Sequence, residues 1–319
     1  MRTQRADRTC RGSQVDRAND ARASGERPAC RDSLASGSRP TVSDVDADEE
    51  VLTRGGVTHV VRVGNTVRRT VRPSTGTVHA YLAHLRSAGF DQAPEPLGYD
   101  EQGREVLSFV PGEVPDEPLP DWATTPEVLT ALAKMLRRLH DASAGWDPGP
   151  DAVFYTPPGP RPPGVVSIVF TPELIAHSDY APTNVVFRDG LPAALIDFDQ
   201  SRRTTRVLDL VNALGYWAPF APAQDRPAVL RDADFLLRTR LFADAYGMDA
   251  AQREQVVPMA LARTRNAMQA QEAAARADPA WRNAWESGLR DEFPRAIAWL
   301  TDNADVITDT LLAEQAAAS

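Results

Sequence analysis

A predicted β-hairpin near the middle of the chain constrains the fold most, because polar residues lie at both of its ends. Residues 185–187 read as a short apolar strand, and residues 194–196 read as a second one. Between them, Asp189 and Gly190 favour a tight turn. Antiparallel pairing of these strands brings the residues after the second strand back beside those that precede the first.

Four polar side chains lie at this predicted junction. His177, Asp179 and Asn184 precede the hairpin, and Asp197 follows it. Oxygens of Asn184 and Asp197 are the hard ligands that Mg²⁺ takes while it binds substrate phosphates. Asp179 is a candidate to accept the proton of an attacking hydroxyl, as phosphoryl transfer requires. The alternative is a turn capped by Asp and Asn with a buried His, but the hairpin and second aspartate favour a catalytic site.

The composition excludes several other classes of protein. The chain has 319 residues, of which 42% are hydrophobic and 25% charged, enough for one large domain or two unequal ones. No run of eighteen apolar residues occurs, so no membrane-spanning helix is expected. The formal net charge of −9 argues against binding to nucleic acid. We therefore expect a cytoplasmic protein.

Lysine and cysteine usage narrows the chemistry further. Lys134 is the only lysine, and it follows Ala133 rather than a glycine, which excludes a Walker-type phosphate loop. Cys10 and Cys30 are the only cysteines, so neither a thiolate zinc site nor a disulfide framework is expected. The scarcity of lysine also suggests that Arg occupies positions where a relative carries Lys.

The N-terminal residues have the composition of a disordered segment. Residues 1–40 hold nine Arg and five acidic residues but few large apolar side chains, and residues 41–50 add five more acids. Such a segment cannot bury enough apolar surface to offset the entropy lost on ordering. We expect residues 1–50 to be a disordered tail.

A second hairpin is predicted where order begins. Residues 60–63 and 66–69 are rich in β-forming side chains, and a two-residue Gly-Asn turn lies between them. This turn pairs Val61 with Arg68, and paired residues share one face of a sheet. Arg68 is then a charged side chain on an apolar face, where it either snorkels to solvent or binds an anion. The pattern leaves both readings open.

The remaining pattern predicts an α+β fold with two lobes, because strands dominate the first ordered block and helices the second. A proline-rich loop is expected at residues 148–164. A strand is expected at residues 105–110, and helices are expected at about 77–87, 125–139, 226–246, 250–276 and 292–312.

The spacing His-x-Asp-x-x-x-x-Asn, followed by Ile-Asp-Phe-Asp, resembles the aminoglycoside phosphotransferase and choline-kinase-like branch of the protein-kinase-like fold. The resemblance covers about residues 51–300. It implies a small β-rich nucleotide-binding lobe and hinge at residues 51–112. It also implies a larger helical lobe at 113–319 with the catalytic loop and acceptor site. ATP or GTP and Mg²⁺ are the implied cofactors, and the implied partner is a small hydroxyl-bearing substrate, with a cation as one option.

Carried over by position, the resemblance gives each candidate residue a role. Asp179 resembles the catalytic base, and His177 resembles the histidine that buttresses its loop. Asn184 and Asp197 resemble the Mg²⁺ ligands. Asp209 resembles an acid that braces the catalytic loop.

The resemblance also implies a set of nucleotide-binding residues. Gly55 and Gly56 resemble a shortened nucleotide-covering loop, and Val61 lies in the strand that follows them. Ser108 and Val110 lie in the segment that resembles the hinge between the lobes, where adenine would contact the backbone.

Two positions depart from the family pattern. The strand lysine that clamps the α- and β-phosphates falls at Arg68, and the helix glutamate that pairs with it falls at His79. These two side chains cannot form an ion pair of opposite sign, although Arg can grip phosphate through two hydrogen bonds. Acids in the late helices are candidates to meet a cationic substrate, with a solvated helix face as the alternative: Glu286, Asp291 and Glu292.

Three functions follow as hypotheses. The first is an ATP-dependent small-molecule phosphotransferase of the aminoglycoside-phosphotransferase type, a group associated with antibiotic resistance. The second is a catalytically impaired, kinase-like binding or immunity protein that sequesters a small molecule or toxin, which the missing Lys–Glu pair motivates. Retention of Asp179, Asn184 and Asp197 together argues against it. The third is a protein kinase, which the compact nucleotide lobe disfavours.

Overall fold

The computed structural model describes residues 49–52, 60–156 and 171–313, together with 162, 165 and 167–169. All of them belong to one compact unit. The expected tail up to residue 48, the pair Gly55 and Gly56, and most of the proline-rich loop lie outside the described residues. Glu49 and Glu50, expected at the end of the tail, instead belong to the first strand.

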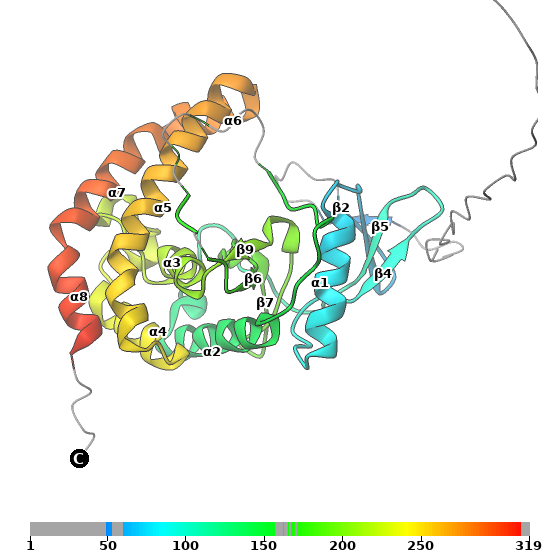
Figure 1. Ribbon diagram of the computed structural model, residues 1–319, viewed down its shortest axis with the longest axis horizontal. Coiled ribbons are helices and arrows are strands. Elements are labelled where there is room, and N and C mark those ends of the chain that lie inside the picture. Colours follow the sequence, from blue (N-terminus) through cyan, green and yellow to red (C-terminus); the bar gives the residue numbers. More distant parts are fainter. Residues whose placement is uncertain are drawn as a thin grey trace, which may run out of the picture. The chain divides into compact units, whose positions relative to one another are not determined.

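An antiparallel sheet occupies the N-terminal region, with the strand order β1-β2-β3-β5-β4 (Figure 1). Its hairpin has the expected register, with Val61 opposite Arg68 and Gly64 at φ 58° in the turn. Helix α1 packs against β4 and α2. The bounds are β1 Glu49–Val51, β2 Val60–Val63, β3 Thr66–Arg69, α1 Thr75–Ser87, β4 Pro96–Tyr99 and β5 Glu105–Ser108.

The C-terminal region is helical, and two short strand pairs carry the polar loops. The pairs are β6 Leu174–Ala176 with β9 Arg202–Thr204, and β7 Val185–Arg188 with β8 Leu191–Leu195. The helices are α2 Pro126–Ser143, α3 Arg206–Trp217, α4 Phe235–Tyr246, α5 Ala250–Ala277, α6 Pro279–Ala284, α7 Arg290–Asp302 and α8 Ala304–Leu312. Single 3₁₀ turns lie at Asp121–Thr124, Pro182–Asn184, Phe198–Gln200, Ala223–Asp225 and Ala228–Leu230, and a π turn lies at Trp285–Leu289.

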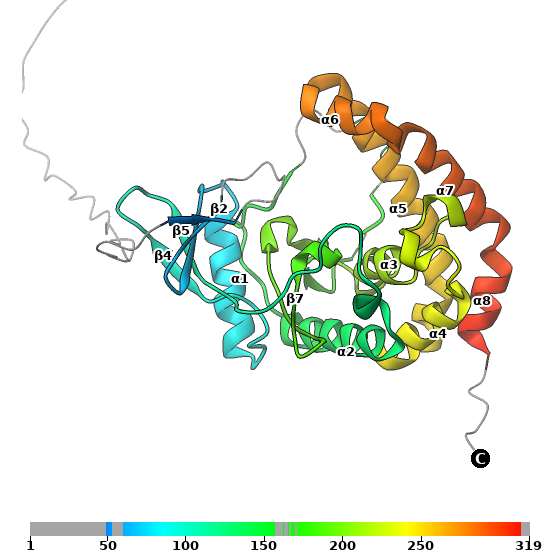
Figure 2. The same ribbon diagram turned by 180° about the vertical axis from the view of Figure 1, so that it is seen from behind.

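The predicted α+β class, with a sheet-rich N-terminal and a helical C-terminal region, is confirmed. Two expected helices are shorter than predicted. The helix expected from residue 226 begins after Asp234, whose side chain caps it, and the chain before it forms short turns after Pro222 and Pro227. The helix expected at 292–312 is interrupted at Asn303. Figure 2 shows α5 running beside α7 and α8.

One apolar core joins α1, α2, β7, α3, α4, α5 and α8 and fixes the polar loop before β7. Tyr180 is fully buried in it, and its hydroxyl donates to the Leu132 carbonyl of α2 at 2.9 Å. The indole N–H of Trp217 in α3 donates to the Tyr180 carbonyl at 2.8 Å. The residue next to Asp179 is therefore held from two helices at once. In the part of the chain that the structure covers, no helix combines the length and apolarity needed to cross a bilayer.

Gly112 lies where the chain leaves the sheet and passes the second hairpin. Its φ is +149°, and a Cβ there would lie 2.4 Å from a Val186 side-chain carbon and 2.5 Å from the Phe187 carbonyl oxygen. The next residue, Glu113, exchanges two backbone hydrogen bonds with Phe187, at 2.9 and 2.7 Å. Glycine at this position therefore lets the segment after β5 lie directly against β7.

Gly112→Ala is expected to lower the free energy of unfolding by about 3 kcal/mol, because strain and a backbone clash act together. Gly103→Ala is the control, since Gly103 also has a positive φ, +75°, but has no atom near its would-be Cβ. That control should cost about 1 kcal/mol. Urea unfolding of both variants measures the difference, and equal losses would contradict the close contact with β7.

Candidate active site

The predicted hairpin forms and brings its two polar ends together. Val185 pairs with Leu195, and the Ile196 N–H donates to the Asn184 carbonyl at 2.9 Å. Asp197 is therefore one residue beyond a direct backbone contact with Asn184. Its backbone has φ 60°, and its side chain is 51% exposed, so the carboxylate is accessible.

Asp179 is held as a hydrogen-bond acceptor by three separate side chains. One carboxylate oxygen accepts from the Asn184 amide at 3.0 Å and from the Gln200 amide at 3.1 Å. The other accepts from the Tyr216 hydroxyl at 3.3 Å. These three donors fix the orientation of the carboxylate.

His177 ties the loop to the end of the hairpin. Its Nδ1 accepts the Asp179 backbone N–H at 3.3 Å, so Nε2 carries the proton and donates to the Ile196 carbonyl at 2.9 Å. Its ring meets Phe198 edge to face at a centroid distance of 4.6 Å. His177 is fully buried and does not itself face a substrate. Its place fits the predicted buttressing role.

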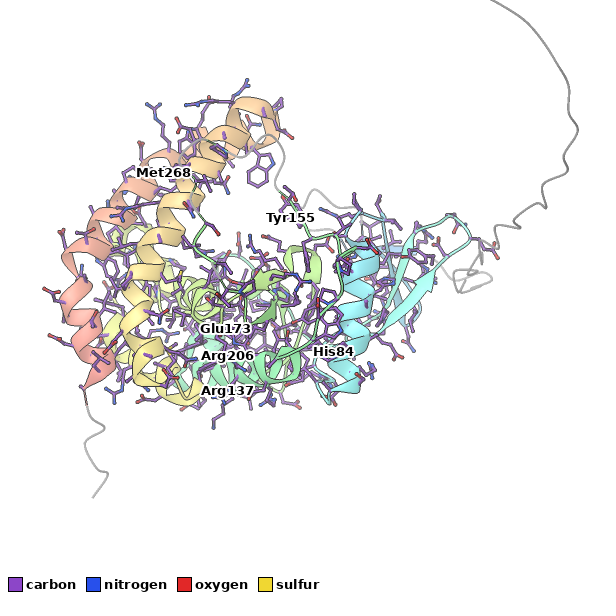
Figure 3. The ribbon with its side chains drawn as sticks, viewed as in Figure 1. His84, Arg137, Tyr155, Glu173, Arg206 and Met268 are labelled. Atoms are coloured by element: carbon purple, nitrogen blue, oxygen red, sulfur yellow. The ribbon has the colours of Figure 1, made fainter. Side chains whose placement is uncertain are left out.

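The buried carboxylate of Asp209 also holds the loop that contains His177 and Asp179. Asp209 accepts the Ser178 backbone N–H at 3.0 Å, and its second oxygen lies 2.9 Å from His140 Nε2. His140 Nδ1 lies 2.8 Å from the Tyr246 hydroxyl, which also accepts from Arg206 at 3.2 Å. Arg206 is labelled in Figure 3. Ser178 has φ 65°, an uncommon conformation that this network holds in place.

Helix α3 supplies three of these supports, and the sequence pattern did not predict the helix. Asp209, Asn212 and Tyr216 are spaced three and seven residues apart, which places them on one helical face. Asn212 accepts the Tyr180 backbone N–H at 2.8 Å. The i, i+3, i+7 spacing of polar residues beside a buried stripe was the available signal for this face.

Arg69, not Arg68, reaches the second aspartate. Arg69 Nη1 lies 3.1 Å from Asp197, and Nη2 lies 2.6 Å from Asp199. Its Nε donates to Glu105, directly opposite on β5. Arg68 instead places its Nε 3.6 Å from the Asp100 carboxylate. Of these two neighbouring arginines, Arg69 is therefore the one that contacts the end of the hairpin.

The alternation of side chains along a strand explains this difference. Val61 is opposite Arg68, and Arg68 is opposite Val106, so these three share one face of the sheet. Ser108, three residues from Glu105 on β5, shares that face. Arg69 lies on the other face, because consecutive strand residues point to opposite sides. The predicted pairing of Val61 with Arg68 is confirmed, and the side chain that reaches the hairpin end belongs to the next residue along the strand.

Glu105 takes the place of the missing helix glutamate. Its side chain is 1% exposed; one oxygen accepts from Arg69, and the other lies 2.9 Å from His79 Nε2 on α1. Burial acts to raise the pKa of Glu105, but the hydrogen bond from His79 and the charge and hydrogen bond of Arg69 outweigh it, so the pKa is lowered. Arg69, Glu105 and His79 therefore form a continuous chain of polar contacts, whereas the sequence pattern had compared only Arg68 with His79.

Ser108 and Val110, the predicted hinge residues, differ in whether their backbone groups already form hydrogen bonds. The Ser108 N–H donates to the Glu95 carbonyl at 2.9 Å, so that donor is already used. The N–H and carbonyl of Val110 make no hydrogen bond with any residue that the structure describes. Val110 is therefore the better placed of the two to pair with a nucleotide base.

The oxygens at the hairpin end fit a divalent cation. The Asn184 amide nitrogen is bonded to Asp179, which leaves its side-chain oxygen as a ligand beside the accessible Asp197 carboxylate. The carboxylates of Asp197 and Asp199 lie at this end. Burial and then the charge of Asp197 raise the pKa of Asp199, while Arg69 opposes the rise. No cage of three His, Cys, Asp or Glu side chains occurs among the described residues, but Mg²⁺ bound to phosphates needs only one or two carboxylates.

The late-helix acids do not form an acidic surface. Glu286 lines an open hollow of about 450 Å³ beside α5 and α6, where three arginines face two glutamates. The charges of Asp291 and Glu292 act on the exposed Arg295. The lining of the hollow is Glu272, Ala275, Arg276, Arg282, Trp285, Glu286 and Arg290.

Glu105→Gln is expected to lower the free energy of unfolding at pH 7 by about 3 kcal/mol, because it leaves Arg69 buried without its closest partner. The lowered pKa means that wild type has this stabilisation above pH 4.5, the ordinary Glu value, and loses it as the pH falls further. Urea unfolding from pH 7 to 3 should show the two curves converge.

Glu95→Gln is the control, since Glu95 is 48% exposed and pairs with Arg86 at the surface. It should cost under about 1 kcal/mol at every pH. A Glu105 effect as small as this, or one independent of pH, would contradict the buried pair.

Comparison with known proteins agrees with this geometry. The sequence model of the "phosphotransferase enzyme family" matches residues 45–156 and 169–246. A trifolitoxin immunity protein of Rhizobium leguminosarum bv. trifolii is 33% identical over 278 residues, which cover 83% of this chain and 99% of that protein.

Two solved structures share the fold. An ethanolamine kinase of Plasmodium vivax has a TM-score of 0.53 at 14% identity, covering 84% of this chain and 85% of that one. An amicoumacin kinase in complex with AMP-PNP and Ca²⁺ has a TM-score of 0.52 at 12% identity, covering 82% and 88%. By its sequence match and by the arrangement of its polar loop and hairpin, the chain belongs to the phosphotransferase enzyme family.

Proposed function

We propose that this protein transfers the γ-phosphoryl group of ATP or GTP to a hydroxyl group of a small molecule. The observation that carries the proposal is the fixed Asp179 carboxylate, with three side-chain donors, beside the hairpin end that presents Asn184 and Asp197. A cytoplasmic location, where nucleoside triphosphates are available, is part of the proposal.

In this mechanism Asp179 orients the acceptor hydroxyl and takes its proton as the new bond to phosphorus forms. Asn184 and Asp197 are the ligands for Mg²⁺, which when bound neutralises charge on the phosphates. His177 and Asp209 keep the loop in place through the backbone of residues 178 and 179.

Arg69 is proposed to hold the phosphates, with Glu105 holding Arg69. A guanidinium has five N–H donors, and its contacts with Glu105, Asp197 and Asp199 use three of them. Two donors are left on a side chain whose pKa is raised: burial alone would lower it, but Glu105, Asp199 and Asp197 outweigh that effect. Val110 is proposed to contact the base through its backbone groups. The roles expected of Gly55, Gly56 and Val61 stay predictions.

A second candidate function is binding without turnover. It is favoured by the relative named as an immunity protein and by the engagement of Arg69 with both Asp197 and Asp199, the carboxylates that would face the metal. Release of ADP in the presence of an acceptor separates the two, because a protein that only sequesters a ligand does not consume nucleotide.

Asp179→Asn is expected to lower kcat about 10³-fold, because the amide cannot accept the proton, while the Kd for nucleotide changes by less than about threefold. The kcat is measured as ADP release with Mg²⁺-ATP and a panel of aminoglycosides, amino alcohols, sugars and hydroxy acids. The Kd for nucleotide is measured by calorimetric titration. Asp189→Asn, in the exposed hairpin turn, is the matched control and should keep full activity. Equal loss of nucleotide binding in Asp179→Asn would remove it from the base role.

The double variant Arg69→Gln/Glu105→Gln is expected to bind Mg²⁺-ATP about 100-fold more weakly than Glu105→Gln alone, because two charge-assisted bonds to phosphate are lost. Removing both charges leaves no unpaired buried ion, so the comparison concerns binding rather than folding. Arg104→Gln, a surface arginine of the same sheet, should bind within about twofold of wild type. Equal affinity of the single and double variants would contradict the role of Arg69.

A further inference from the structure

Two arginines lie near Asp179 and take no part in the network that holds it. Arg202 begins β9 and pairs with Ala176, the residue immediately before His177. Gln200, two residues before Arg202, already donates to Asp179. The Arg202 side chain is exposed, and within the described residues it forms neither a hydrogen bond nor an ion pair.

The second arginine, Arg263, comes from α5, which packs against α3. Its charge acts on Tyr216 of α3, the residue that donates to Asp179. Burial and then the charge of Asp179 raise the pKa of Tyr216 to about 12, and Arg263 acts against that rise. Arg263 is half-buried, and its side chain also lacks an ion-pair partner in the part of the chain described.

The charges of the two guanidinium groups act on each other. The pKa of Arg202 is lowered, first by burial and next by the charge of Arg263, although the side chain is accessible to solvent. Asp209 and Asp179 supply the opposing negative charge, but both already accept hydrogen bonds from other groups. The phenol of Tyr155, labelled in Figure 3, also acts on Arg202.

We propose that Arg202 and Arg263 form the acceptor subsite, and that the acceptor carries an anionic group, a carboxylate or a phosphate, near the hydroxyl that Asp179 orients. This inference rests on the proposed function and narrows its substrate class. A guanidinium binds either anion through paired, charge-assisted hydrogen bonds. A cationic acceptor would instead be repelled by both guanidinium groups.

The anion at this subsite is distinct from the nucleotide triphosphate. Arg202 and Arg263 come from β9 and α5 of the helical region, whereas Arg69 comes from β3 and contacts Asp197. Asp179 is reached from α3 through Tyr216 and from the hairpin end through Gln200. Substitution of Arg202 or Arg263 should therefore change affinity for the acceptor and leave affinity for nucleotide unchanged.

Binding to one three-carbon scaffold tests the subsite without requiring turnover. The probes are glycerate, glycerol 3-phosphate, glycerol and 3-amino-1,2-propanediol, titrated into the full chain with saturating ADP. At least one anion should bind about tenfold or more tightly than glycerol and the amine. Arg202→Gln and Arg263→Gln should each weaken that binding about tenfold, with the Kd for ADP unchanged.

Two neighbouring arginines serve as matched controls. Arg203 is next to Arg202 on β9 but pairs with Asp147 at the surface, and Arg276 is on α5 with Arg263 but pairs with Glu272. Arg203→Gln and Arg276→Gln should bind the anion as wild type does. Absence of measurable anion binding, equal binding of the amine, or a parallel loss of ADP affinity would each overturn the subsite.

ADP release with Mg²⁺-ATP then separates this inference from the proposed function. Anion binding that depends on both arginines, without turnover of any acceptor, would overturn phosphoryl transfer and keep the anion site. Turnover confined to neutral or cationic acceptors would overturn the anion site and keep phosphoryl transfer. Phosphorylation of glycerate or glycerol 3-phosphate that falls about tenfold in either arginine variant supports both and shows which anion is preferred.

Discussion

The candidate site depends on one buried cation that faces three carboxylates. Arg69 contacts Glu105 within the sheet, and it contacts Asp197 and Asp199 at the end of the catalytic hairpin. Its side chain is only 8% exposed, so these interactions are weakly screened by solvent. Arg72 also reaches Asp199, at 3.1 Å, yet burial and the Asp197 charge still raise the pKa of Asp199. Accessible carboxylate and amide oxygens of this kind suit a divalent cation, which neutralises the charge of a polyphosphate.

A second constraint acts on the catalytic loop from helix α3. Three residues on one face of this helix contact the loop: Asp209 through the Ser178 N–H, Asn212 through the Tyr180 N–H, and Tyr216 through the Asp179 carboxylate. The backbone is thereby fixed at both neighbours of Asp179 while the carboxylate itself is oriented. These three supports come from one helix packed in the core, and they add to the contacts that Asn184 and Gln200 make with the Asp179 carboxylate.

The sequence predicted the parts of the site that depend on local pattern. The turn at Asp189 and the apolar strands beside it were sufficient for the return of Asp197 to Asn184, because hairpin pairing is set by a few adjacent residues. The register of the first hairpin followed in the same way, with Val61 opposite Arg68. These relations need no knowledge of distant packing.

The parts of the site that the sequence did not predict depend on tertiary contacts. Both faces of β3 carry an arginine, and the choice between Arg68 and Arg69 depends on where α1 and the hairpin end lie. Glu105 could not be identified as a partner from its position in a strand, since cross-strand neighbours are set by sheet order rather than by sequence distance. Helix α3 was missed because its buried polar residues interrupt the apolar pattern that usually marks a core helix.

The glutamate that pairs with Arg69 lies on a strand and not on a helix, and this changes how Arg69 is held in place. A glutamate on a helix can pair with a strand cation only when the helix lies in the correct position, so the pair reports helix placement. Here Glu105 and Arg69 are opposite each other on adjacent strands, and the hydrogen bonds of the sheet fix their separation. His79 connects α1 to this pair, because its Nε2 lies 2.9 Å from the second oxygen of Glu105. The sheet therefore fixes the pair of Arg69 with Glu105, and the contacts with Asp197 and Asp199 join that pair to the end of the hairpin.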